Sequence, residues 1–216
     1  MKVLLLHAFP LDERMWEFQR PVLEGHDVVA PRLYGRGSTM NAWAESIAAE
    51  TEGEEVAVVG ASMGGYCAFA LARLAPERVR GLLLLGARPD ADSDERRKGR
   101  ADTIELIRAD GADGLWRMMR PKLFHDDGAA DEGLLYRDAD GLVGAVEAIR
   151  DREDSTEAAR SFSGPVRFVI GEHDPFVSAS ELGGFDVVEL SGAGHLANIE
   201  RPTEFNELLG EFLLRV

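Results

Sequence analysis

The chain has 216 residues, which suits one domain with a single core rather than two. Its composition, 45% hydrophobic and 29% charged, excludes a disordered chain, and the net charge of −15 argues against nucleic acid or membrane surfaces as partners. Cys67 is the only cysteine, so no intrachain disulfide can form. No apolar run approaches the ~20 residues of a membrane span, and a cytoplasmic location is the simplest expectation.

Short apolar runs alternate with longer helical patterns along the chain. The predicted strands are residues 3–7, 26–30, 55–59, 79–85, 166–170 and 185–190. The predicted helices of the main domain lie near residues 15–23, 41–51, 63–75 and 203–214. Because continuous apolar strands separated by helices form parallel sheets covered on both faces, the chain is predicted to be an α/β domain.

One long segment contains no strand signal. Residues 88–163 show helical patterns only, near residues 103–109, 115–119, 134–137 and 142–149. We expect a helical cap inserted into a core made of residues 1–87 and 164–216, although a small decorative subdomain is also compatible with the pattern. Apolar bulk is concentrated in this segment, and four of its side chains are expected to bind substrate: Trp116, Met119, Leu123 and Phe124.

The motif Gly60-Ala61-Ser62-Met63-Gly64 lies between a predicted strand and a predicted helix. A serine in such a sharp turn adopts a strained backbone that projects its hydroxyl above the sheet. The turn brings Gly60 and Gly64 together, so both must be small. A phosphate-binding loop would need a Gly-Lys-Ser or Gly-Lys-Thr sequence, and a dinucleotide loop needs another glycine spacing. We therefore interpret Ser62 as a nucleophile.

A serine hydroxyl is a weak nucleophile unless a neighbouring base takes its proton. His195 is the predicted base, because it follows the last predicted strand, and parallel sheets place their sites at the carboxyl ends of strands. Asp174, after the preceding strand, is predicted to orient the imidazole, with Glu172 as the less favoured alternative. No third ligand of suitable spacing lies near His173 and Asp174, so no metal is expected.

Acyl transfer also needs N–H donors for the negative charge that develops on the carbonyl oxygen. The N–H of Met63 directly follows the nucleophile. The loop after the first strand, His7-Ala8-Phe9-Pro10, is expected to supply the second donor. Pro10 has no N–H, so Phe9 is the predicted donor, and its ring is expected to form a wall of the substrate pocket. His7 is expected to support this loop rather than to take part in the chemistry.

With these residues in place, the chain resembles the α/β-hydrolase superfamily along nearly its whole length, and it looks most like small bacterial esterases and enol-lactonases with short lids. The resemblance implies an α/β-hydrolase fold with a serine–histidine–aspartate triad. It rests on these segments: His7-Ala8-Phe9-Pro10-Leu11-Asp12, Gly60-Ala61-Ser62-Met63-Gly64-Gly65, Gly171-Glu172-His173-Asp174-Pro175, Gly192-Ala193-Gly194-His195 and Asn198-Ile199-Glu200-Arg201-Pro202.

Three departures from the family pattern stand out. Ala8 occupies a position that is usually glycine, and Arg32 replaces the usual aspartate after the second strand. The first strand, at residues 3–7, matches the third strand of the family, so the two antiparallel strands that normally precede it are missing. The resemblance therefore predicts a minimal six-stranded, all-parallel sheet whose edge is exposed or used for dimerisation.

These residues predict a serine hydrolase that cleaves a small or medium ester or lactone through an acyl-enzyme. No cofactor is expected, the partner is expected to be a small-molecule substrate, and the protein is expected to be a monomer or homodimer. Arg36 or Arg152 is an alternative anchor for a substrate carboxylate. Two other functions stay open. The same triad can act on a C–C bond, thioester or peptide, as a hydrolase or lyase, or the scaffold can bind ligands without catalysis.

Overall fold

A computed structural model describes all residues, 1–216, and contains one six-stranded sheet. The strands are β1 (Lys2–Leu6), β2 (Asp27–Val29), β3 (Val56–Ala61), β4 (Val79–Leu85), β5 (Val166–Gly171) and β6 (Asp186–Leu190). Their order is β2-β1-β3-β4-β5-β6, and every neighbouring pair is parallel. The predicted six-stranded, all-parallel sheet is confirmed.

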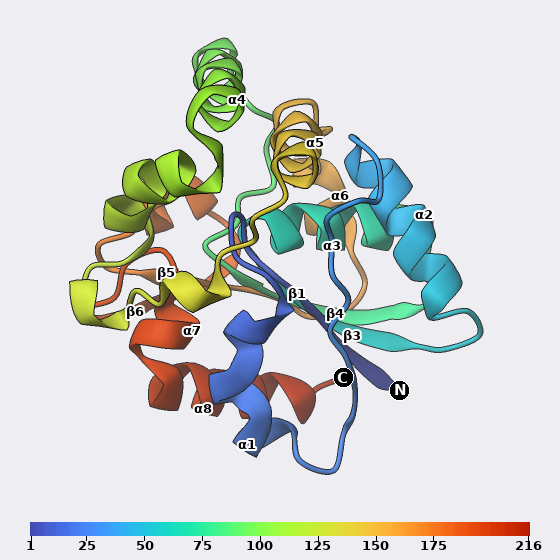
Figure 1. The fold of residues 1–216 in the computed structure, drawn as a ribbon. Coiled ribbons are helices and arrows are strands. Elements are labelled where there is room, and N and C mark those ends of the chain that lie inside the picture. The colour runs from blue at the N-terminus through green and yellow to red at the C-terminus, as the bar shows by residue number, and fades with distance from the viewer.

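Helices cover both faces of this sheet (Figure 1). One face carries α2 (Met40–Glu50), α3 (Met63–Leu74) and α6 (Thr156–Ser161), whereas the other carries η1 (Glu13–Gln19), α1 (Arg20–Leu23), α7 (Ala197–Glu200) and α8 (Pro202–Leu213). A short turn of helix, η4 (Ala179–Leu182), precedes β6. One hydrophobic core of 64 buried residues joins the layers, because each buried strand presents apolar side chains to both sides.

The predicted helix at residues 15–23 is in fact two shorter pieces. The 3₁₀ helix η1 begins after Asp12, whose carboxylate accepts a hydrogen bond from the N–H of Arg14. The α-helix α1 then begins at Arg20. Pro21 has no N–H to donate a helical hydrogen bond where η1 meets α1. The 3₁₀ helix η1 and the α-helix α1 therefore do not merge into one helix.

The segment between β4 and β5 is helical. It contains α4 (Asp94–Leu123), η2 (Asp127–Ala129), η3 (Glu132–Leu134), α5 (Ala139–Arg150) and α6. The two patterns at residues 103–109 and 115–119 both fall in α4, which is interrupted at Gly111, where φ is 64°. No helix in the structure combines the length and apolar character needed to cross a bilayer.

The helix predicted at residues 134–137 is wrong, because this stretch pairs with the loop after β1 instead. Leu135 forms an antiparallel bridge with Leu11. The N–H of Asp12 donates to the carbonyl of Leu134, and the N–H of Tyr136 donates to the carbonyl of Pro10. Backbone partners from a distant loop thus replace the hydrogen bonds that a helix would have made.

The order of the strands places the predicted site residues close to one another. The chain runs from β1 outward to β2 and then returns to β3 on the other side of β1, which makes a switch point in the sheet between β1 and β3. The loops after such neighbouring strands diverge and leave a crevice at their carboxyl ends. The loop after β1 carries Phe9 and the turn after β3 carries Ser62, so the predicted oxyanion donor and nucleophile lie at this switch point.

Candidate active site

Ser62 occupies the turn between β3 and α3 in a strained conformation. Its φ is 48° and its ψ is −109°, and it is the only non-glycine residue with positive φ. Such a backbone costs about 1–3 kcal/mol and persists only where the surrounding structure fixes it. Here the N–H of Ser62 donates to the carbonyl of Leu85 at 2.7 Å, and its carbonyl accepts from the N–H groups of Gly65 and Tyr66.

The glycines around the serine permit this turn, as the sequence predicts. A Cβ at Gly60 would lie 2.7 Å from the carbonyl oxygen of Gly64, and a Cβ at Gly64 would collide with the backbone of Leu6 on β1. Neither position has room for a side chain. The close approach of α3 to β1 and β3 therefore depends on these two glycines.

The imidazole of His195 is paired with Asp174. The distance between Nδ1 of His195 and Oδ2 of Asp174 is 2.7 Å, and the side chains are 3% and 0% exposed. His195 follows β6 and Asp174 follows β5, which is the neighbouring strand. With the hydrogen on Nδ1 donated to the carboxylate, Nε2 is left as the acceptor, which is the arrangement a general base requires.

The backbone around Asp174 fixes its carboxylate. Oδ1 accepts hydrogen bonds from the N–H groups of Phe176 and Val177 at 2.8 and 3.3 Å, so Oδ2 is left for His195. The alternative, Glu172, lies elsewhere. Its Oε2 accepts from the hydroxyl of Ser191 and the N–H of Gly192, and its side chain is 45% exposed. The structure therefore pairs His195 with Asp174 and not with Glu172.

Two residues that the sequence reasoning missed pack against the imidazole. Gly86, after β4, has a φ of 55°, and a Cβ there would lie 2.7 Å from Cε1 of His195. The ring of Phe176 meets the imidazole edge-on, with centroids 4.7 Å apart. A glycine directly after a buried strand was the available signal for Gly86, because it stands at the strand edge where the site forms.

Glu200 holds the loop that carries His195. Its side chain is buried, and Oε2 accepts a hydrogen bond from the N–H of Gly194 at 2.7 Å. Its other oxygen accepts from the N–H groups of His125 and Asp126, which follow α4. One carboxylate thus connects the histidine loop to the insertion. A buried acidic residue at the end of the short helix α7, five residues after His195, was the sequence signal for it.

The predicted oxyanion donors lie at the same edge of the sheet. Met63 is the first residue of α3, where an N–H has no carbonyl of the preceding helical turn to bond. The N–H of Phe9 donates no hydrogen bond within the protein. Ala8, the unusual residue in this loop, is fully buried, and its N–H donates to the sulfur of Met15 at 3.1 Å.

His7 is fully buried beneath the oxyanion loop. Its Nε2 accepts a hydrogen bond from the N–H of Leu33 at 2.9 Å, and its Nδ1 lies 3.3 Å from the carbonyl oxygen of Ala8. The neutral imidazole with hydrogen on Nδ1 satisfies both contacts. Burial lowers the pKa of His7 to about 4, because the charged form loses its hydration. His7 thus ties the loop after β1 to the segment after β2.

Ser62 and His195 line one cavity of about 50 Å³, and no hydrogen bond joins their side chains in the structure. The cavity lies between the core and the helical insertion, residues 88–163. The other residues that line it are Phe9, Tyr66, Arg88, Asp92, Arg96, Arg100, Met119, Ile149 and Phe176. A larger hollow of about 760 Å³ lies beside β2 and contains none of the predicted catalytic residues.

The predicted substrate-binding residues divide into two groups. Phe9 and Met119 line the cavity. Trp116, Leu123 and Phe124 are buried but do not line it, and the rings of Trp116 and Phe124 pack edge to face. Most of the large apolar side chains in this part of the insertion thus attach it to the core, and only some of them line the cavity.

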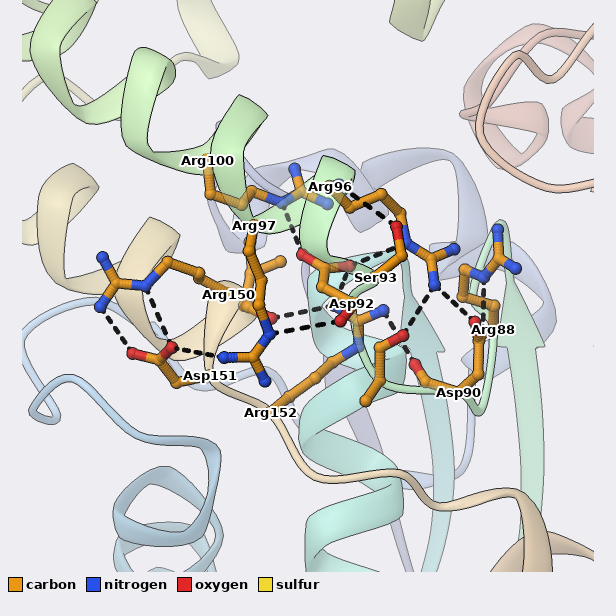
Figure 2. Close-up of polar contacts among 12 residues, drawn as sticks. Arg88, Asp90, Asp92, Ser93, Arg96, Arg97, Arg100, Arg150, Asp151 and Arg152 are labelled. Carbon is orange, nitrogen blue, oxygen red and sulfur yellow. Dashed lines mark hydrogen bonds and ion pairs between the residues drawn. The ribbon is translucent and has the colours of Figure 1, made fainter.

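The charges on the cavity wall could not be predicted from the sequence. Asp92 has a fully buried side chain, and Oδ1 lies 2.6 Å from Nη1 of Arg152 and 3.4 Å from Nε of Arg96. The other oxygen accepts a hydrogen bond from Nε of Arg100 at 3.1 Å. Figure 2 shows these three guanidinium groups gathered around the one carboxylate. In an acidic chain such arginines are expected on the solvated surface, which is why their role was not recognised.

A second carboxylate extends this network. Asp90 accepts from Arg88 at 2.5 Å and from Arg96 at 2.6 Å (Figure 2). Burial alone would raise the pKa of Asp90, but the hydrogen bonds from these arginines outweigh it and the pKa lies below its ordinary value. We call Arg88, Asp90, Asp92, Arg96, Arg100 and Arg152 the arginine network.

The two arginines named as alternative substrate anchors do not line the cavity. Arg36 bonds to Ser46 and Glu50 on the outer side of α2. Arg152 belongs to the arginine network and lies over the ring of Tyr66, 4.1 Å from its centroid. Arg32, which replaces the aspartate usual in the family, forms an ion pair with Glu13.

Comparisons with known proteins support the fold and the family. Residues 3–208 match the family model described as the alpha/beta hydrolase family. A thermophilic esterase from Thermogutta terrifontis, whose structure is described as malate bound, is 29% identical with a TM-score of 0.89, covering 99% of this chain and 89% of that one. The enol-lactonase from Burkholderia xenovorans LB400 is 24% identical with a TM-score of 0.82, covering 98% and 90% of the two chains, and supports the fold alone.

Among curated proteins, the chain is 28% identical to the dihydrolipoyllysine-residue acetyltransferase component of the acetoin cleaving system of Cupriavidus necator. The match covers 98% of this chain but only 63% of that protein, so the chain spans less than two thirds of the relative's length. The family match extends over most of the sequence and includes the predicted nucleophile, base and acid. The chain belongs to the alpha/beta hydrolase family.

Proposed function

We propose that the protein is a serine hydrolase that cleaves a small or medium ester or lactone through an acyl-enzyme. One observation carries this proposal. His195, paired at 2.7 Å with the buried carboxylate of Asp174, lines the same cavity as a serine held in a strained strand-to-helix turn. Similarity to the Thermogutta esterase supports the ester as substrate class.

The chemistry follows from the atoms available. Oγ of Ser62 attacks the carbonyl carbon, and its proton passes to Nε2 of His195 while Asp174 stabilises the imidazolium. The N–H groups of Phe9 and Met63 bind the oxyanion. The imidazolium then gives its proton to the leaving alcohol, and the acyl group remains on Ser62. A water molecule, activated by the same imidazole, hydrolyses the acyl-enzyme and restores the serine.

The helical insertion serves as the cap of this site. It contributes Arg88, Asp92, Arg96, Arg100, Met119 and Ile149 to the wall of the cavity that Ser62 also lines, so it covers this cavity. A cavity of about 50 Å³ has room for only a few water molecules. We therefore expect short acyl groups to be preferred, and longer ones to require the cap to shift.

Covalent labelling tests the nucleophile directly. A fluorophosphonate should modify the folded protein at Ser62, and Ser62→Ala should abolish both the labelling and ester hydrolysis, whereas Ser161→Ala on the exposed side of α6 should change neither. A panel of p-nitrophenyl esters of increasing acyl length should show the fastest turnover for the shortest chains. Failure of the folded protein to react at Ser62 would disprove the proposal.

A further inference from the structure

The cavity that Ser62 lines also has a positively charged part of its wall, although the protein as a whole is strongly acidic. Arg88, Arg96 and Arg100 line the cavity, and Asp92 is the only carboxylate that lines it with them. The whole chain carries a net charge of −15. A concentration of guanidinium groups at the one place where substrate binds calls for an explanation in terms of the substrate.

Arg100 has unused hydrogen-bonding capacity. Its Nε donates to the buried carboxylate of Asp92 at 3.1 Å, which fixes the guanidinium plane. Its two terminal nitrogens donate no hydrogen bond to any protein atom. Two parallel N–H groups on a fixed guanidinium match the two oxygens of a carboxylate.

Arg96 is arranged in a similar way. Its Nη2 donates to Asp90 and to the carbonyl of Ala91, at 2.6 and 2.7 Å, whereas Nη1 donates to no protein atom. Its Nε is buried and makes no hydrogen bond. The four arginines of the network, Arg88, Arg96, Arg100 and Arg152, pair with three carboxylates, Asp90, Asp92 and Glu181. One positive charge of the network is therefore left without a carboxylate partner in the protein.

Building on the proposed hydrolase function, we infer that Arg100 and Arg96 bind a carboxylate of the substrate. The substrate class is then an ester or lactone that carries a free carboxylate a few atoms from the scissile carbonyl, such as the half-ester of a short dicarboxylic acid. The arginine wall attracts the anion and orients the carbonyl toward Ser62. The ester bond itself is cleaved as described above.

A matched pair of substrates tests this inference. The p-nitrophenyl half-ester of glutaric acid carries the carboxylate, and the p-nitrophenyl ester of glutaramic acid replaces it with an amide of the same size. We expect the wild-type protein to favour the acid in kcat/KM by about tenfold or more. Arg100→Gln should remove most of this preference, and Arg100→Lys, which keeps the charge but not the planar fork, should retain part of it.

Arg108→Gln is the control, because Arg108 lies on the same helix and pairs only with Glu105 at the surface. It should keep the wild-type preference. Equal kcat/KM for the acid and the amide in the wild-type protein, or an unchanged ratio in Arg100→Gln, would overturn the inference while leaving the serine hydrolase proposal intact.

Calorimetry with glutarate separates the two proposals further. The wild-type protein should bind glutarate, and Arg100→Gln should bind it about tenfold more weakly. This measurement does not need hydrolysis. If neither ester is cleaved and Ser62 does not react with a fluorophosphonate, the hydrolase proposal fails, and glutarate binding still decides whether the arginines form a carboxylate site. Absence of glutarate binding to the wild-type protein would contradict that site.

Discussion

The two sides of the cavity are built in different ways. On the core side, Ser62, Asp174 and His195 follow three strands of one sheet, and their positions are set by tight turns and backbone hydrogen bonds. On the insertion side, the wall is held by ion pairs among long side chains, centred on Asp92 and Asp90. The core side is suited to fixed geometry for a reaction, whereas the insertion side is suited to recognising charge.

This difference implies that substitutions on the core side should mainly affect the rate, and substitutions on the insertion side should mainly affect stability and substrate preference.

Asp174→Asn should reduce kcat for a short p-nitrophenyl ester by roughly 10³–10⁴-fold, because an amide cannot hold the imidazole in the tautomer that leaves Nε2 unprotonated. Glu172→Gln, in the same loop but bonded to Ser191 and Gly192, is the matched control and should change kcat by less than about threefold. Similar losses of kcat in the two variants would show that the pairing of Asp174 with His195 makes no particular contribution to catalysis.

Asp92→Asn should lower the free energy of unfolding by about 3–5 kcal/mol, because it leaves Arg152 buried without a charged partner. Asp151→Asn is the control. That carboxylate pairs with Arg97 and Arg150 but is 42% exposed, so its loss should cost less than about 1 kcal/mol. Urea denaturation of both variants measures their free energies of unfolding. Equal losses in the two variants would show that Asp92 is no more important to stability than an exposed carboxylate.

His7 should make stability depend on pH. Its pKa is about 4 in the folded protein, below the ordinary value of 6.5, so the unfolded chain binds the proton more readily. The contribution of the neutral His7 imidazole to the free energy of unfolding is therefore complete above pH 6.5. This contribution, about 3 kcal/mol in total, is lost as the pH falls toward 4. The wild-type protein should lose more unfolding free energy between pH 7 and 5 than His7→Gln. An NMR titration midpoint near 6.5 for the His7 imidazole would contradict this.

Gly86→Ala should disturb the core side by a smaller amount. Its Cβ would lie 2.7 Å from the imidazole of His195, at a backbone φ of 55° that alanine disfavours, so we expect a loss of about 1–3 kcal/mol in stability and a reduced kcat. Gly99→Ala in α4 meets no atom within 4 Å and should be neutral or stabilising. Unchanged activity in Gly86→Ala would show that the imidazole is free to move.

Much of the core side could be predicted from the sequence because its signals are local. The glycines around Ser62 mark a turn that only small residues allow, and the loops of Asp174 and His195 stand directly after predicted strands. Parallel strands then bring those loops to one edge of the sheet. The stretch near Leu135 shows the limit of such local reasoning, because its helical pattern is overridden by pairing with Leu11 from a distant loop.

The sequence alone therefore determined the six parallel strands, the strained turn at Ser62 and the placement of His195 in a loop directly after the last strand. The tertiary structure decided that Asp174 rather than Glu172 meets the imidazole, that Trp116 and Phe124 pack away from the cavity, and that Asp92 is buried among arginines. The reason is physical. Backbone preference and hydrophobic periodicity act over a few residues and can be read along the chain. The burial of a charge depends on partners far away in the sequence, and Arg152 reaches Asp92 only after the insertion has folded back on itself.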